Sequence, residues 1–150
     1  MSTYQAMSVF KAVTPDFSVA AQLAHADFAR AAAEGYRTII NNRPEGEGPD
    51  QLSEAEARQA AAEAGLAYHT LPFSGPPPPG IVAETADLLE QVEGPVLAYC
   101  RSGTRSITVW ALAQALTGAR APAEILSLAG KAGYDLSGAA MALEHLSPKA

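Results

Sequence analysis

The sequence predicts a single domain of the α/β class, in which a mostly parallel sheet is flanked by helices on both faces. Three observations lead to this prediction. Short runs rich in large apolar residues alternate with longer stretches of helical periodicity, which is typical of parallel strands joined by helices. Turns rich in Gly and Pro separate these runs. The length of 150 residues suits one core, so we expect residues 1–150 to form one domain.

The N-terminal part of the sequence predicts a hairpin followed by a helix and a strand. Residues 8–13 and 17–22 are half-apolar runs separated by Thr-Pro-Asp, which favours a hairpin at one edge of the sheet. The Ala-rich residues 26–34 indicate a helix, and Gly35 suits the position just after its end. Residues 36–40 then predict a buried strand.

The next part predicts a loop, a helix and another strand. Residues 41–50 are too polar and too rich in Gly and Pro for regular structure, so we expect a loop at the carboxyl end of the preceding strand. Ser53 and Glu56 have the spacing of a capping box, which predicts the start of a helix that Gly65 ends. Residues 66–70 are a further candidate strand.

The second half of the sequence contains the most apolar strand and the most apolar helix. Residues 71–80 are stiffened by prolines and predict an extended loop. Residues 96–100 predict a central strand, because nearly every position is apolar. Residues 107–116 are apolar on nearly all sides, which indicates a buried helix. The helices expected in this half cover residues 81–92, 107–116, 122–132 and 137–146.

Composition narrows the classes of function. The net charge of −6 is the wrong sign for a broad phosphate-binding surface, so we expect no nucleic-acid partner. We see neither a secretory signal nor a span of about 18 to 20 apolar residues, and therefore expect a cytoplasmic protein without a membrane contact. A lone cysteine excludes an intrachain disulfide and a multi-cysteine zinc site. His25, His69 and His145 lack metal-ligand spacing, and we expect neither a metal nor a cofactor.

The segment from residue 96 to residue 107 contains the candidate catalytic residues. A buried strand delivers Cys100 to its carboxyl end, and a short turn with Gly103 leads directly into the buried helix. Backbone N–H groups of residues 101–106 can then converge on one point, where the helix start adds partial positive charge. Such a setting favours the thiolate, so we predict that Cys100 is a nucleophile. A lone buried cysteine of purely structural character is the alternative, but it does not explain the neighbouring Gly, Arg and hydroxyl residues.

Other residues of the same segment are candidates for binding an anion. Arg105 lies in the first helical turn, where its guanidinium can clamp an oxyanion held above the sulfur. Arg101 suits an outward position that steers anions, and Ser106 suits a hydrogen bond to the thiolate. In a separate loop, Arg43 follows a predicted strand and either contacts substrate or pairs with Glu45 or Glu47 at the surface. The candidate anion-binding residues are Arg101, Ser102, Gly103, Thr104, Ser106 and Arg43.

These motifs resemble a known family. Tyr-Cys-Arg-Ser-Gly-Thr-Arg-Ser at 99–106, Tyr-Arg-Thr-Ile-Ile-Asn-Asn-Arg-Pro-Glu-Gly-Glu at 36–47 and Tyr-His-Thr-Leu-Pro-Phe at 68–73 look like the marks of the beta-lactamase-hydrolase-like phosphatase domains, also described as a sulfur transferase family. The resemblance spans roughly residues 8–117. It implies a fold similar to dual-specificity tyrosine phosphatases, with Cys100 as nucleophile, Arg105 as oxyanion ligand and Arg43 at the rim of the site.

Two departures from the phosphatase pattern favour sulfur transfer. Only four residues separate Cys100 from Arg105, one fewer than in tyrosine phosphatases, and this shorter loop is similar to that of rhodaneses. Tyrosine phosphatases carry a general acid in the loop after the preceding strand, but the corresponding residues 71–80 contain no Asp, Glu or His. The remaining candidate acids are Asp16, Asp50, Glu84 and Asp87, each of which suits a cap or an exposed surface better.

We therefore predict a rhodanese-like sulfurtransferase that carries sulfane sulfur as a persulfide on Cys100. Its partners would be a small anionic sulfur donor, such as thiosulfate or a glutathione persulfide, and an external thiol acceptor. Two alternatives remain open: a phosphohydrolase that acts on a phosphoester through a phosphocysteine, and a non-catalytic module that binds anions.

Overall fold

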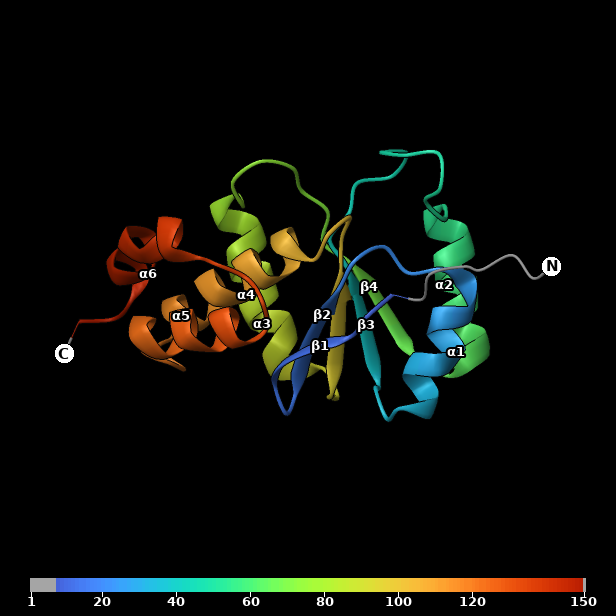
Figure 1. Ribbon diagram of the computed structural model, residues 1–150, viewed down its shortest axis with the longest axis horizontal. Helices are drawn as coiled ribbons and strands as arrows, with labels where there is room; N and C mark the ends of the chain where they lie inside the picture. Colours follow the sequence, from blue (N-terminus) through green and yellow to red (C-terminus); the bar gives the residue numbers. More distant parts are fainter. Residues whose placement is uncertain (1–7, 150) are drawn as a thin grey trace.

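The computed structural model describes residues 8–149 and contains one five-stranded sheet (Figure 1). The strand order is β1-β2-β5-β3-β4. β1 runs antiparallel to β2, and the other neighbouring pairs are parallel, so the predicted mostly parallel sheet is confirmed. The strands are β1 (Lys11–Thr14), β2 (Phe17–Ala20), β3 (Thr38–Asn41), β4 (Ala67–Thr70) and β5 (Val96–Tyr99).

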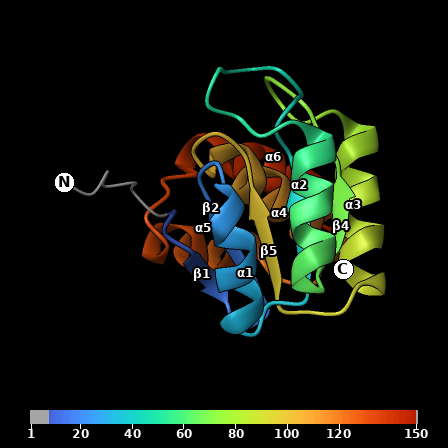
Figure 2. The same cartoon turned by 90° about the vertical axis from the view of Figure 1, so that its right-hand side faces the viewer.

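Helices cover both faces of the sheet, as the sequence predicts. α1 (His25–Ala33) and α2 (Glu54–Ala64) lie on one face and are in front of the strands in Figure 2. The other face carries α3 (Pro79–Gln91), α4 (Thr104–Thr117), α5 (Pro122–Lys131), a 3-10 turn at Ser137–Ala139 and α6 (Ala140–Leu146). Within the described residues, no helix has the length and apolarity needed to cross a membrane.

The two faces bury separate apolar clusters. On the α1 and α2 face, Phe28 packs edge-on against Tyr99 of β5. On the other face, Trp110 of α4 stacks on Phe17 of β2, with ring centroids 5.5 Å apart. α4 is buried on nearly all sides because α3, α5 and α6 pack around it. The two clusters fix β5 and α4, and therefore the turn between them, in the middle of the protein.

Most element boundaries shift by a few residues from the prediction, and two of the helices illustrate this. α3 begins at Pro79, inside the residues expected to be a loop, because proline at the first turn lacks only an N–H that would have no partner there. The last predicted helix starts as a 3-10 turn and becomes α-helical at Ala140. Ser53 and Glu56 form the predicted capping box, and Gly65 ends α2 at a φ of 78°.

The parallel strands bring three loops to one edge of the sheet. Residues 42–53 follow β3, residues 71–78 follow β4, and residues 100–103 follow β5, all at the upper edge in Figure 1. Open parallel sheets bind ligands outside the carboxyl ends of their strands. The candidate site is therefore built where these three loops meet.

Candidate active site

Cys100 lies directly after the central strand, at the start of the turn that leads into α4. It is fully buried, and its own N–H donates to the carbonyl oxygen of Ala20 at 3.4 Å. The backbone N–H of Gly103 donates to the Cys100 sulfur at 3.1 Å. This contact points a backbone donor of the turn at the sulfur atom.

Gly103 is the residue that allows this turn to close. Its φ of 92° lies in the left-handed region that favours glycine. A Cβ atom at this position would also lie 2.2 Å from the Tyr134 hydroxyl oxygen. Tyr134 in turn donates from that hydroxyl to the carbonyl oxygen of Ser102 at 3.0 Å. The sequence offers no signal for Tyr134, which reaches the turn from the segment after α5.

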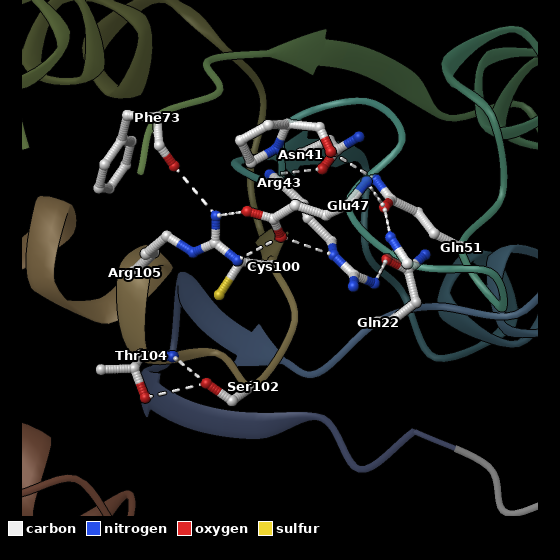
Figure 3. Close-up of polar contacts among 12 residues, drawn as sticks. Gln22, Asn41, Arg43, Glu47, Gln51, Phe73, Cys100, Ser102, Thr104 and Arg105 are labelled. Carbon is white, nitrogen blue, oxygen red and sulfur yellow. Dashed lines mark hydrogen bonds and ion pairs between the residues drawn. The ribbon is translucent and has the colours of Figure 1, made fainter. Parts of the chain in front are cut away.

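Arg105 lies in the first turn of α4 and already binds a carboxylate of the protein. Its Nη1 atom donates to Glu47 Oε2 at 2.9 Å, and its Nη2 atom donates to Glu47 Oε1 at 2.8 Å. The two side chains thus form a bidentate ion pair (Figure 3). Nη1 also donates to the carbonyl oxygen of Phe73, in the loop after β4, at 3.1 Å. The hydrogen bonds to Glu47 raise the pKa of Arg105, and the negative charge of a Cys100 thiolate adds to this effect.

Glu47 links Arg105 to a second arginine. Arg43 Nε donates to Glu47 Oε1 at 3.0 Å, so one carboxylate joins two guanidinium groups. The pKa of Glu47 is lowered to about 2, mainly by the hydrogen bond from Arg105. Arg43 lowers this pKa further, whereas burial of the carboxylate raises it. Figure 3 shows the Cys100 sulfur near the same Arg105 guanidinium, and the charge of the cysteine acts on that arginine. Glu47 therefore occupies both terminal guanidinium nitrogens of Arg105, the groups with which this arginine could bind an oxyanion.

Arg43 is buried rather than at a surface rim. Only 4% of the residue is exposed, and its Nη1 donates to Gln22 Oε1 at 2.9 Å. Its backbone N–H donates to Asn41 Oδ1 at 2.8 Å, which turns the chain inward after β3. The sequence suggests either a substrate contact or a surface pair with a glutamate; the structure pairs it with Glu47 below the surface.

Ser106 has a different partner from the one expected. Its hydroxyl donates to Asn42 Oδ1 at 2.8 Å, and both side chains are buried. Asn42 Nδ2 donates in turn to the carbonyl oxygen of Leu71 at 3.0 Å. The predicted hydrogen bond from Ser106 to the Cys100 sulfur is replaced by this contact, because Asn42 offers a buried oxygen that would otherwise have no donor. Ser106 thus ties α4 to the loops after β3 and β4.

The remaining residues of the turn face outward. Arg101, Ser102 and Thr104 are exposed, as suggested for Arg101. The Ser102 hydroxyl donates to Thr104 Oγ1 at 3.1 Å, so these two side chains bind each other.

Of the carboxylates considered from the sequence, Asp50 lies in the same loop as Glu47, close to Gly48, and the other three lie elsewhere. Asp16 is in the β1–β2 turn, at the opposite end of the sheet from Cys100. Glu84 and Asp87 line a groove beside β4, together with His69. Among the described residues, Glu47 is the carboxylate that contacts Arg105. Its role cannot be read from the sequence, which indicates it only as a surface partner of Arg43.

The fold and this site together define a class of protein. A central parallel strand that ends in a buried cysteine, a tight turn, and an arginine in the first turn of the next helix give the protein a tyrosine-phosphatase-like fold. The model of one family, the phosphatase-like domain of the beta-lactamase hydrolase-like proteins, matches residues 9–117. The chain belongs to this family, as the sequence motifs suggest.

Relatives agree with this assignment. A beta-lactamase hydrolase-like protein of Agrobacterium fabrum is 36% identical over 136 residues, which cover 87% of this chain and 30% of that protein. The chain thus spans about 30% of the length of this curated relative. The crystal structure of a candidate phosphatase of Neisseria meningitidis is 32% identical, with a TM-score of 0.79 and coverage of 90% of this chain and 96% of that one. Tk-PTP shares the fold at 17% identity and a TM-score of 0.69, over 91% of this chain and 95% of its own.

The prediction of a sulfurtransferase is wrong by these findings. The family and its solved relative are phosphatase-like, and they give no support to a rhodanese-like loop, a sulfur donor or a thiol acceptor. The shorter turn is the main argument for sulfur transfer. In the structure, however, this turn places Arg105 so that two of its nitrogen atoms bind two oxygen atoms of one acidic group. That arrangement suits the oxygens of a phosphoryl group.

Proposed function

We propose that the chain is one phosphatase-like domain that hydrolyses phosphomonoesters through a phosphocysteine on Cys100. In this proposal the Cys100 thiolate attacks phosphorus, and Arg105 binds two of the phosphoryl oxygens. The backbone N–H groups of the turn and the start of α4 bind the remaining negative charge. A water molecule then releases phosphate from the sulfur.

The observation that carries the proposal is the bidentate contact of Arg105, which lies near Cys100, with an acidic group. A guanidinium in this orientation is ready to bind an oxyanion, and the Gly103 N–H already donates to the sulfur. The family assignment supports the same reaction class. Of the residues suggested as anion ligands, the turn backbone from Arg101 to Ser106 supplies N–H groups, while the Ser106 side chain has a structural role.

The proposal is tested by hydrolysis of para-nitrophenyl phosphate. We expect wild-type protein to turn over this ester, Cys100→Ser to abolish turnover, and Arg105→Ala to lower kcat about 100-fold or more. Arg58→Ala is a matched control, because Arg58 lies on α2 and pairs with Glu54 at the surface.

Circular dichroism of each variant shows whether it is folded. Folded wild-type protein that binds inorganic phosphate without turning over the ester would contradict the proposal and favour a non-catalytic anion-binding module. Turnover that survives in Cys100→Ser would contradict the phosphocysteine.

A further inference from the structure

Hydrolysis of a phosphomonoester requires a proton for the leaving oxygen, and the loop after β4 has no side chain to supply it. An alkoxide or phenolate leaves slowly unless an acid protonates it, an effect of about 10²- to 10⁴-fold. Residues 71–80, which contain this loop, include no Asp, Glu or His. The donor must therefore come from another element that reaches the site.

Glu47 is in a position to supply it from the loop after β3. Its carboxylate contacts the guanidinium of Arg105 directly (Figure 3), and the same guanidinium lies near Cys100. A phosphoryl group bound to Cys100 would take over the contacts with Arg105, because it carries more negative charge than one carboxylate. Glu47 keeps its second contact, with Arg43 Nε at 3.0 Å, and so stays beside the group that displaces it.

The backbone of the loop around Glu47 is held in place on both sides of this residue. Gly46 precedes it with a φ of 73°, a conformation that glycine adopts without strain. Gly48 follows it, and a Cβ atom there would lie 2.8 Å from Arg43 Nη2. The backbone N–H of Glu47 donates to Gln51 Oε1 at 2.8 Å, which anchors the backbone while the side chain can turn.

Substrate binding also changes the acidity of Glu47 in the direction that catalysis needs. The hydrogen bond from Arg105 is the largest cause of its low pKa in the free protein. When a phosphoryl group takes that hydrogen bond, the cause is removed and a negative charge is placed beside the carboxylate. Both changes raise the pKa of Glu47, although contact with Arg43 still opposes them. The charged side chains that contact Glu47 are Arg43 and Arg105, and Asp50 lies in the same loop, close to Gly48.

We propose that Glu47 is the general acid of this site, displaced from Arg105 by the substrate and retained beside the leaving group by Arg43. This inference rests on the proposed phosphatase function. In the first step, the Cys100 sulfur forms a bond to phosphorus, the bond from phosphorus to the ester oxygen breaks, and that oxygen takes the proton of Glu47. In the second step, water attacks phosphorus, its proton goes to the Glu47 carboxylate, and the bond from sulfur to phosphorus breaks to give phosphate and the thiolate.

A series of aryl and alkyl phosphates with leaving groups of different basicity tests this role with Glu47→Gln. A leaving group as acidic as dinitrophenol needs no proton, so we expect kcat for dinitrophenyl phosphate to change less than about threefold. For phenyl or alkyl phosphates we expect kcat to fall by about 100-fold or more. We also expect the wild-type kcat to fall on the basic side of its pH profile, and this limb to be absent from Glu47→Gln.

Glu45→Gln is the matched control. Glu45 lies in the same loop, and its Oε1 accepts from the Glu54 N–H at the start of α2. We expect this variant to retain the wild-type dependence on the leaving group.

The outcomes separate the inference from the function on which it rests. An equal loss for every leaving group in Glu47→Gln, with turnover of dinitrophenyl phosphate still dependent on Cys100, would overturn the role of Glu47 alone. Absence of wild-type turnover for every ester would overturn the phosphatase function itself.

Discussion

Replacing Glu47 with glutamine should make the free protein bind inorganic phosphate more tightly. An incoming phosphate must break both contacts between Arg105 and the Glu47 carboxylate, at 2.8 and 2.9 Å. A glutamine side chain at this position would retain an oxygen acceptor but would lose the negative charge, so the internal competitor for Arg105 is weakened. Tighter binding of an anion together with slower turnover of poor leaving groups would be the combined signature of the two roles argued for Glu47.

The size of the effect follows from the exposure and geometry of the ion pair. Exposed ion pairs contribute about 0.2 to 1 kcal/mol. The pair here has two charge-assisted hydrogen bonds, and its side chains are 19% and 29% exposed, so we take a contribution of about 1 kcal/mol, at the upper end of that range. This value corresponds to about fivefold tighter binding of phosphate by Glu47→Gln.

The assay is competitive inhibition of ester hydrolysis by inorganic phosphate near pH 7 and at low ionic strength. Wild type, Glu47→Gln and Glu45→Gln are compared, and the inhibition constant should fall only in Glu47→Gln. Added salt should reduce the difference, because it screens the charges of the partly exposed pair. Weaker phosphate binding by Glu47→Gln would refute the reasoning, because the carboxylate would then support the anion site rather than compete for it.

Three further predictions concern the framework of the site. Gly103→Ala should lose about 2 kcal/mol or more of stability in chemical denaturation, because the positive φ and the 2.2 Å approach to the Tyr134 hydroxyl both oppose a side chain; an unchanged midpoint would contradict this. Ser106→Ala should lower the free energy of unfolding by about 1 to 3 kcal/mol, because it leaves the buried Asn42 oxygen without its donor. A loss of stability no larger than that of the exposed control Ser102→Ala would argue against this. The stability advantage of wild type over Glu47→Gln should be constant above about pH 5 and should shrink as the pH falls from 4.5 towards 2. The reason is that the folded pKa of Glu47 is about 2 and its ordinary value is 4.5; an advantage that grows on acidification would contradict this.

The sequence predicts well those parts of the fold that depend on neighbouring residues, where the pattern of apolar positions matches the burial seen in the structure. β5, the turn at Gly103 and α4 are contiguous in the sequence, so the sequence alone places Cys100 and Arg105 at one site. The hairpin, the capping box of α2 and the alternation of strands and helices are likewise local features.

The parts that sequence does not predict depend on contacts between distant segments. Glu47 and Arg105 are 58 residues apart, and the loop that carries Glu47 has no periodicity from which its direction could be inferred. Tyr134 reaches Ser102 from 32 residues away, after the stretch that matches the family. The spacing of Cys100 and Arg105 favours sulfur transfer only when it is considered by itself. In the structure, Arg105 binds both carboxylate oxygens of Glu47, so this arginine can accommodate two oxygens of one acidic group.

The most direct test of the account is to trap the covalent intermediate. Wild-type protein is mixed with dinitrophenyl phosphate, quenched within the first turnover and digested, and the peptide that contains Cys100 is examined by mass spectrometry. The account predicts a phosphoryl group on the Cys100 sulfur, absent from Cys100→Ser and decaying at the rate at which phosphate is released. Turnover with an unmodified Cys100 at every quench time, or with the phosphoryl group on another residue, would contradict it.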